Sequence, residues 1–356
     1  MKITAAVLVM AVLFCSVSFL LVQTSIGGEM HIRGFYREPK ESLDVVLFGS
    51  SEMYAGYSAP LAYKNAGFTS YNLCFEGAPG NLYKSMLCET LKNQSPKLAV
   101  VEVNGFFYSE ETMKQEARLR KWVDSIPLSA NRINTINENV EAKDRLPYYF
   151  NIMKYHSNWE RTDKISRRIT AIDTINKQGV SLMKSFSTKT TMDEKLPKKI
   201  VPKKLHDYNI KVIDDFAKYC ESSEVEDVLF IRMPHCLKLE KKYDDMISQT
   251  VEKYGYKYVN FDNYFKEMQL TKSHDFYNPE HLNVFGNRKF TNFLSDYIKN
   301  EYNPAGEHSP EIEKKWLECA EYTENAFGIL EERTLKKEGK YYFEFSDFSQ
   351  AGDKTE

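Results

Sequence analysis

The chain has 356 residues, 42% of them hydrophobic, and its 48 basic and 50 acidic residues give a formal net charge of -2. This length can form one large α/β domain, or one domain with an insertion. The near balance of charge argues against a nucleic-acid-binding protein, because such proteins carry a clear basic surplus.

The first segment along the chain is uncharged from Ile3 to Val22. Twenty helical residues span about 30 Å, the thickness of a bilayer's hydrocarbon core. A cleavable signal peptide, the alternative, usually has a shorter apolar stretch and a small-residue cleavage site, which is not evident here. We expect a single-pass anchor over residues 1–23. Because Lys2 precedes the span, the positive-inside rule predicts an extracytoplasmic domain.

Residues 24–43 are predicted to be a juxtamembrane linker, and residues 44–304 to form an α/β domain. Short apolar runs alternate there with helix-like stretches, which is typical of a parallel sheet covered by helices on both faces. The predicted strands cover 44–48, 70–73, 98–103, 227–232 and 256–260, and the predicted helices cover 81–91, 208–220, 239–254 and 284–299.

Two further segments differ from this pattern. Residues 109–205 lack strand runs and are rich in charged residues, Asn and Thr, so we expect a helical insertion or lid. Its stretch from Lys184 to Lys204 is basic and is expected to be mobile. Residues 305–356 form a polar C-terminal extension to which the sequence assigns no role. The six cysteines form no CxxC pair, so no metal site is predicted, and the five beyond Cys15 are expected to be buried thiols.

Polar residues follow three of the predicted strands, which is where open parallel sheets place their sites. Ser51 lies at the turn after the first strand, where a serine can present its hydroxyl at the sheet edge. Gly77 follows the second strand and lets the backbone approach a ligand. Asn104 follows the third strand, and its amide is a candidate donor to an oxyanion.

A downstream segment reads Asp275-Phe-Tyr-Asn278-Pro-Glu-His281. A serine hydroxyl needs a base to take its proton, and the usual base is a histidine that a carboxylate or amide orients. We therefore predict Ser51 as the nucleophile and His281 as the base. Either Asp275 or Asn278 can orient the histidine. We favour Asp275, because a carboxylate stabilises an imidazolium and an amide does not.

Arg232 and His235 follow the fourth predicted strand, in the segment Phe-Ile-Arg-Met-Pro-His. From this edge of the sheet they are candidates to bind a substrate carboxylate or phosphate. A purely structural role for the pair agrees equally well with the sequence.

These blocks resemble those of the SGNH/GDSL hydrolases, which are flavodoxin-like esterases, lipases and acyl transferases. The turn Gly49-Ser-Ser51 stands where that family has Gly-Asp-Ser, and Asn72 with Gly77 keeps the spacing of its second block. The resemblance implies that Ser51 forms an acyl-enzyme and that the N–H groups of Ser51 and Gly77 hold the oxyanion. No cofactor is implied.

Three positions depart from the family pattern. Ser50 replaces the family's aspartate, and Asn104 lies about two residues early for the third block, which puts its oxyanion role in doubt. The last block is Asp-x-x-His-Pro in the family, and here Asn278 replaces the aspartate before His281.

Two longer segments, FGSSEMYAGYSAP and DFYNPEHLNVFGNRKFTNFLSDYI, are similar to one branch of that family. It comprises membrane-anchored proteins of Gram-positive bacteria that resemble the teichoic acid D-alanyl transfer and exopolysaccharide acyl-transfer proteins. The resemblance covers about residues 33–108 and 208–300. It implies a three-layer α/β/α fold, acylated cell-wall or exopolysaccharide glycans as substrates, and an acyl-transfer partner in the membrane.

Residues and resemblance together predict an extracytoplasmic serine esterase or O-acyltransferase that acts on acylated glycans through a Ser–His acyl-enzyme mechanism. Two alternatives stay open. The changes at Ser50, Asn104 and Asn278 are compatible with a catalytically inactive SGNH-like protein that binds glycans or serves in assembly. The helical insertion is compatible with a structural, membrane-tethered adaptor.

Overall fold

A computed structural model describes residues 2–22, 26–192, 204–338 and 341–343. Its centre is a five-stranded sheet in which every strand pairs in parallel with its neighbours. The strands, in sheet order, are β2 (Ser70–Cys74), β1 (Val45–Gly49), β3 (Leu98–Glu102), β5 (Asp227–Arg232) and β6 (Lys257–Asn260). This is the doubly wound order of flavodoxin-like sheets, and it confirms the predicted α/β class.

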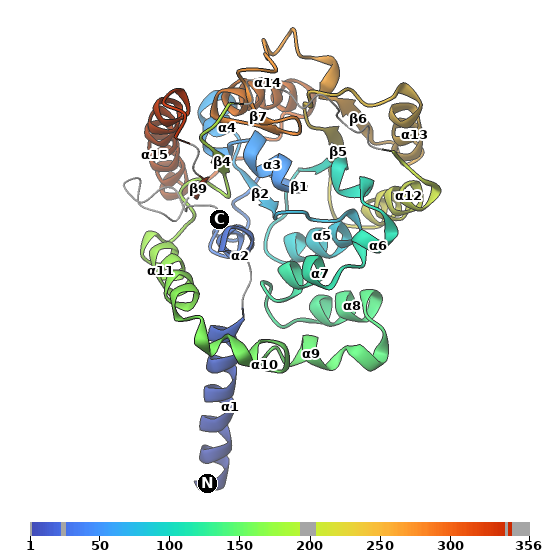
Figure 1. Cartoon of the computed structure of the whole chain (residues 1–356). Helices are drawn as coiled ribbons and strands as arrows, with labels where there is room; N and C mark the ends of the chain where they lie inside the picture. The colour runs from blue at the N-terminus through green and yellow to red at the C-terminus, as the bar shows by residue number, and fades with distance from the viewer. Residues whose placement is uncertain (1, 23–25, 193–203, 339–340, 344–356) are drawn as a thin grey trace.

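Helices cover both faces of the sheet and bury its strands. Every residue of β1, β2 and β3 is buried. One layer of helices contains α3 (Ser51–Gly56), α4 (Ala59–Ala66), α14 (Val284–Tyr302) and α15 (Pro310–Leu335). The other contains α5 (Tyr83–Leu91), α12 (Asp207–Glu221) and α13 (Lys241–Glu252) (Figure 1).

Short 3-10 helices join several of these elements. They are η1 (Gly80–Leu82), η2 (Val103–Phe107) and η5 (Phe261–Asn263). A two-stranded hairpin of β7 (Phe276–Asn278) and β8 (His281–Leu282) precedes α14. His281, the candidate base, is the first residue of β8, and α14 begins two residues after β8 ends.

Most of the segment expected to be an insertion is helical. It contains α6 (Glu110–Met113), α7 (Glu116–Val123), α8 (Ala130–Asn139), η3 (Ala142–Asp144), α9 (Leu146–Tyr149), α10 (Ile152–Tyr155), η4 (His156–Glu160) and α11 (Thr162–Gln178). The strand β4 (Ser187–Lys189) then pairs antiparallel with β9 (Tyr341–Phe343) of the C-terminal segment. Figure 1 shows α8, α9 and α10 as a layer at the level where α1 meets the domain.

Lys184 differs from the expectation of a mobile basic stretch. Its ammonium group is buried and forms an ion pair with Glu38 at 2.8 Å, and it lies over the Trp316 ring at 4.6 Å. A basic residue is readily assigned to the surface from sequence, because its buried partner lies 146 positions away. Residues 193–203 of this stretch lie outside the described residues.

The C-terminal segment packs onto the domain through α15. Phe327 and Leu330 of this helix meet Met183 and Phe186 of the insertion in a second, smaller apolar core. The polar composition of residues 305–356 conceals this helix, because only one of its faces is apolar and buried.

The N-terminal helix α1 (Lys2–Leu21) projects from the domain (Figure 1). Its Thr4–Leu21 portion has a mean hydropathy of 2.5 and is long and apolar enough to cross a membrane. The segment after it is more than the predicted linker, since it contains α2 (Ile26–Phe35). Ile32 and Phe35 of α2 are buried in the main core.

Candidate functional site

The site forms where the strand order reverses, between the carboxyl ends of β1 and β3. Gly49 ends β1, and a Cβ atom there would lie only 2.9 Å from the Cβ of Glu102, so no side chain fits. The Glu102 carboxylate accepts hydrogen bonds from the N–H and the hydroxyl of Ser50, both at 3.2 Å. Ser50 in turn caps α3 by accepting from the N–H of Glu52. These contacts fix the turn that places Ser51 at the first position of α3.

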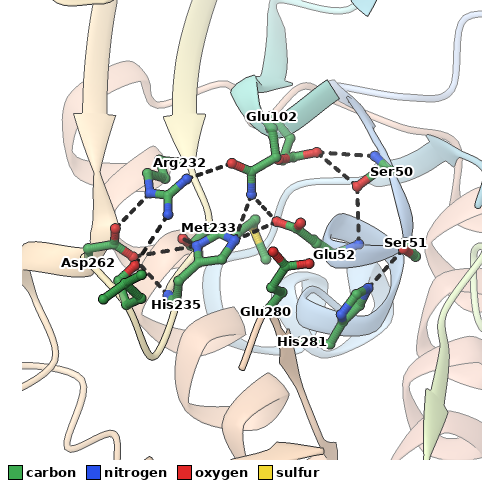
Figure 2. A network of polar contacts seen from close by, with 12 residues as sticks. Ser50, Ser51, Glu52, Glu102, Arg232, Met233, His235, Asp262, Glu280 and His281 are labelled. Carbon is green, nitrogen blue, oxygen red and sulfur yellow. Dashed lines mark hydrogen bonds and ion pairs between the residues drawn. The ribbon is translucent and has the colours of Figure 1, made fainter. Parts of the chain in front are cut away.

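Ser51 and His281 are in direct contact, although 230 positions separate them. The hydroxyl oxygen of Ser51 lies 2.8 Å from His281 Nε2 (Figure 2). Both side chains are half-buried, so the pair is reachable from solvent. The ring of Tyr277 stacks on the imidazole with centroids 5.1 Å apart, which limits rotation of the histidine.

Asn278 holds the other side of the imidazole. Its amide oxygen accepts from the backbone N–H of Glu280 at 2.9 Å and lies 3.0 Å from His281 Nδ1. Because the Glu280 N–H must face an acceptor, the oxygen and not the amide nitrogen points inward. Nδ1 therefore carries the proton, and Nε2 presents its lone pair to the Ser51 hydroxyl. This is the tautomer that a general base needs.

Asp275 does not occupy the position that the sequence favours. Its carboxylate accepts from His274 Nδ1 at 2.8 Å, from Lys289 at 2.8 Å and from the backbone of Thr271 at 2.6 Å. In the β7–β8 hairpin Asn278 pairs directly with His281, whereas Asp275 precedes β7 and faces α14. Asp275 thus anchors the base of the hairpin, and Asn278 orients the histidine.

A buried polar network lies beside the Ser–His pair (Figure 2). Asn104 Nδ2 and His235 Nε2 both donate to the Glu52 carboxylate, the imidazole at 2.8 Å. Arg232 donates to the Asn104 amide oxygen and to Asp262, both at 2.6 Å. The backbone N–H of His235 donates to the second oxygen of Asp262 at 2.8 Å. Every member of the network is buried.

This network shows where three of the predicted site residues lie. Arg232 and His235 are only 2% and 3% exposed, so the structure favours the structural alternative over binding to substrate. The Asn104 amide has partners at both its oxygen and its nitrogen within the site, so it is not positioned as a donor to an oxyanion.

The charges in the network alter the pKa values of its members. Burial and the Arg232 charge lower the pKa of His235, but the Glu52 charge and the hydrogen bonds that His235 donates to Asp262 and Glu52 outweigh them and raise it above 6.5. Burial raises the pKa of Asp262, yet its bonds to His235 and Arg232 bring it below 3.8. With His235 protonated, the cations of Arg232 and His235 lie against the carboxylates of Asp262 and Glu52.

Glu52→Gln is expected to flatten the dependence of stability on pH above pH 6.5. A histidine whose folded pKa is raised contributes stability that is complete below its unfolded pKa of 6.5 and is lost as pH rises through the folded pKa. The thermal unfolding midpoint of the wild type should therefore fall as pH rises above 6.5. The variant lacks the charge that raises this pKa, so its midpoint should stay nearly level.

Two comparisons help to isolate the contribution of His235 in this pH range. Burial lowers the pKa of His31 to about 3, so His31 affects stability only as pH falls below 6.5. Glu76→Gln removes an exposed carboxylate near the site and serves as the control, with the wild-type slope expected. An equal slope in Glu52→Gln and wild type would contradict the assignment.

Gly77 lies on the loop after β2 with φ +68°, in the left-handed region that favours glycine. A Cβ atom there would collide with the guanidinium of Arg118, which donates to the Gly77 carbonyl at 2.5 Å. Lys121 donates to the carboxylate of the neighbouring Glu76, so two side chains of α7 in the insertion fix the position of this loop. Within the described part of the chain, the backbone N–H groups of Ser51 and Gly77 donate to no protein acceptor. Both remain available for a ligand oxygen.

Asp262 is the site residue that sequence reasoning misses. It lies two residues after β6, at the same carboxyl edge of the sheet as the other site residues. Polar residues just after parallel strands are expected at the site, and this rule, which predicts Ser51 and Asn104, also applies to Asp262. Among the described residues, no group of three or more His, Cys, Asp or Glu side chains is arranged to hold a metal ion.

Comparisons with protein-family models, with curated proteins and with solved structures found no match for this chain. The architecture is established as an α/β fold with a five-stranded parallel sheet and an N-terminal apolar helix. Any activity has to be inferred from the site itself.

Proposed function

We propose that the chain is a membrane-anchored serine esterase or O-acyltransferase of the SGNH type, with its domain on the extracytoplasmic side. The observation that carries the proposal is the 2.8 Å contact between the Ser51 hydroxyl and His281 Nε2, with Asn278 fixing the imidazole tautomer. A hydroxyl at a helix N-terminus beside a correctly protonated base is the arrangement of an activated serine.

In the proposed reaction, Ser51 Oγ attacks the carbonyl carbon of an ester while its proton passes to His281 Nε2. The N–H groups of Ser51 and Gly77 donate to the oxyanion that forms. His281 then returns the proton to the departing alcohol, which leaves an acyl group on Ser51. Water, or the hydroxyl of an acceptor, attacks this acyl-enzyme with His281 again as base, and Ser51 is released.

The substrate class rests on the placement of the site and on the family resemblance. Figure 1 shows α3 and β7 at the end of the molecule away from α1, so a membrane-anchored chain would present the site away from the bilayer. An acyl ester on a cell-wall or exopolysaccharide glycan fits this position. A membrane protein that supplies or receives acyl groups is the partner that the resemblance suggests.

The insertion is suited to decide between hydrolysis and transfer. Arg118 and Lys121 of α7 hold the loop of Glu76 and Gly77, whose N–H group is the proposed oxyanion donor. A shift of α7 would therefore change both the oxyanion hole and the access of water to the acyl-enzyme.

A fluorophosphonate probe is expected to label the detergent-solubilised full-length chain at Ser51, and Ser51→Ala should abolish labelling. The probe reacts only with a serine whose proton a base accepts, so it reports on the Ser51–His281 pair without requiring the natural substrate. Peptide mapping by mass spectrometry distinguishes Ser51 from the adjacent Ser50.

Ser222→Ala, at the exposed end of α12, is the control and should label as the wild type does. Absence of labelling in a folded wild-type chain would contradict an activated serine. Saturable binding of an acylated glycan in that case would favour the inactive, glycan-binding alternative.

A further inference from the structure

A large apolar groove lies between α1 and the insertion, remote from the Ser–His pair. It has a volume of about 1290 Å³, which exceeds the roughly 300–1,000 Å³ of typical small-molecule sites. One wall is a face of α1 that includes Val7, Ala11 and Phe14, and the other wall includes Phe150 and Ile172 of the insertion. A site of this size and character suits a ligand with long hydrocarbon chains.

The C-terminal end of α1 is held against the insertion by hydrogen bonds. Arg168 donates to the carbonyl oxygens of Phe19 and Val22, the second at 2.6 Å, and Asn158 donates to the carbonyl of Leu21 at 3.0 Å. The guanidinium of Arg168 also lies 4.4 Å from the centre of the Phe19 ring. These contacts hold both walls of the groove in one arrangement.

Large exposed apolar side chains concentrate in the insertion, which forms one wall of this groove. Outside α1, ten described residues carry such side chains, and eight of them lie within residues 128–169. Leu128 is 76% exposed, Trp159 65% and Phe150 47%. Figure 1 shows the helices of this range extending sideways at the level of the upper end of α1. Aromatic and aliphatic residues in this position are typical of a surface that rests in the interface of a bilayer.

The upper rim of the groove is basic. Arg37 is exposed and has no side-chain partner among the described residues. Arg132 is only partly compensated, since its nearest carboxylate oxygen, on Asp124, is 3.8 Å away and Asp124 also binds Arg120. Arg33 and Arg168 share one carboxylate, that of Glu29. The rim therefore carries a surplus of positive charge where the groove meets the end of the apolar helix.

We propose that this groove binds a glycerophospholipid with an anionic headgroup from the adjoining leaflet. Its acyl chains lie along the Val7–Phe19 face of α1, and its phosphate lies at Arg37 and Arg132. This inference rests on the proposed membrane anchorage, because only an embedded α1 brings the groove level with lipid. An apolar channel ending in cations at the interface complements a lipid with an anionic headgroup.

A second transmembrane helix is the competing occupant. Helices that associate in membranes usually do so through small residues that allow close approach. The face of α1 that lines the groove includes Met10, Phe14 and Phe19 beside its small residues. A helix would also add no anionic partner for Arg37 or for the partly compensated Arg132. Both observations favour a lipid.

Native mass spectrometry of the detergent-solubilised full-length chain tests the proposal, with phosphatidylglycerol and phosphatidylcholine as probes. One phosphatidylglycerol is expected to be retained per chain, and phosphatidylcholine to bind more weakly. The double variant Arg37→Gln/Arg132→Gln should lose at least roughly tenfold in affinity for phosphatidylglycerol, or about 1.4 kcal/mol, because the lipid phosphate loses both of its cationic partners. Ala11→Trp narrows the groove from the α1 side and should weaken retention.

Two controls make the result specific. Ala5→Trp places the same side chain on α1 at a residue that does not line the groove, and Lys143→Gln removes an exposed positive charge from the same insertion. Both should retain lipid as the wild type does. Equal retention in Ala11→Trp and Ala5→Trp, or a protein dimer without lipid, would overturn the proposal.

The outcomes are also separable from those of the proposed esterase. Probe labelling at Ser51 without lipid retention would refute only the groove assignment. Lipid retention in a chain whose serine does not react would refute only the esterase.

Discussion

His281→Ala is expected to lower kcat for hydrolysis of p-nitrophenyl acetate by about 10⁴-fold or more, to the level of Ser51→Ala. The two residues act as one unit, since the hydroxyl becomes a nucleophile only when Nε2, 2.8 Å away, takes its proton. Loss of either partner should therefore cost about as much as loss of both. Steady-state kinetics of the two single variants and the double variant measure this non-additivity.

His274→Ala is the matched control. His274 lies seven residues before His281 and contacts a carboxylate, but its partner Asp275 anchors the hairpin and does not touch the reacting pair. Its kcat should stay within about threefold of the wild type. An unchanged kcat in His281→Ala would rule out the proposed base, and purely additive effects in the double variant would argue against a shared step.

The same assay tests the role of Asn278. Asn278→Leu removes the acceptor that fixes the proton on Nδ1, so it should lower kcat by about 10²–10⁴-fold through the wrong tautomer. Asn278→Asp keeps the acceptor and adds a charge that stabilises the imidazolium, so it should raise kcat roughly tenfold, or about 1.4 kcal/mol in the barrier. Unchanged kcat in both variants would contradict an orienting role for this side chain.

The strands and the serine turn are predictable from sequence because their signals are local. A buried parallel strand has to be a continuous apolar run, and β1 and β3 are such runs that end in polar turns. Once the strands are known, parallel pairing brings their carboxyl ends to one edge. That geometry places Ser51 and Asn104 in the same region before any contact is known.

The partner of each polar side chain is harder to predict. Asp275 and Asn278 both precede His281 closely, and only the pairing of β7 with β8 brings Asn278 to Nδ1. Arg232 resembles a substrate ligand until its bonds to Asp262 and Asn104, which lie 30 and 128 positions away, are known. Such choices depend on tertiary distances that a linear pattern does not contain.

Arg232→Met is expected to lower the free energy of unfolding by about 3–5 kcal/mol, because it leaves the buried Asp262 carboxylate without its cation. Chemical denaturation of the solubilised chain measures the loss. Asp262→Asn in the same chain should recover part of it, since the amide oxygen can still accept from the backbone of His235 without carrying a charge. A coupling energy of about 1 kcal/mol or more between the two substitutions would show that the residues act as a pair.

Arg288→Met provides the contrast on the surface. Arg288 also binds two carboxylates, those of Glu324 and Glu331, but it is half-exposed and its pairs are screened by solvent. Its replacement should cost about 1 kcal/mol or less.

The comparison separates the two candidate roles of Arg232, as a buried counter-ion and as a substrate ligand. A large loss of stability identifies it as the internal counter-ion that holds Asn104 away from the oxyanion. An unchanged stability with a raised KM would instead place its guanidinium on the substrate, and the buried network would have to open when substrate binds.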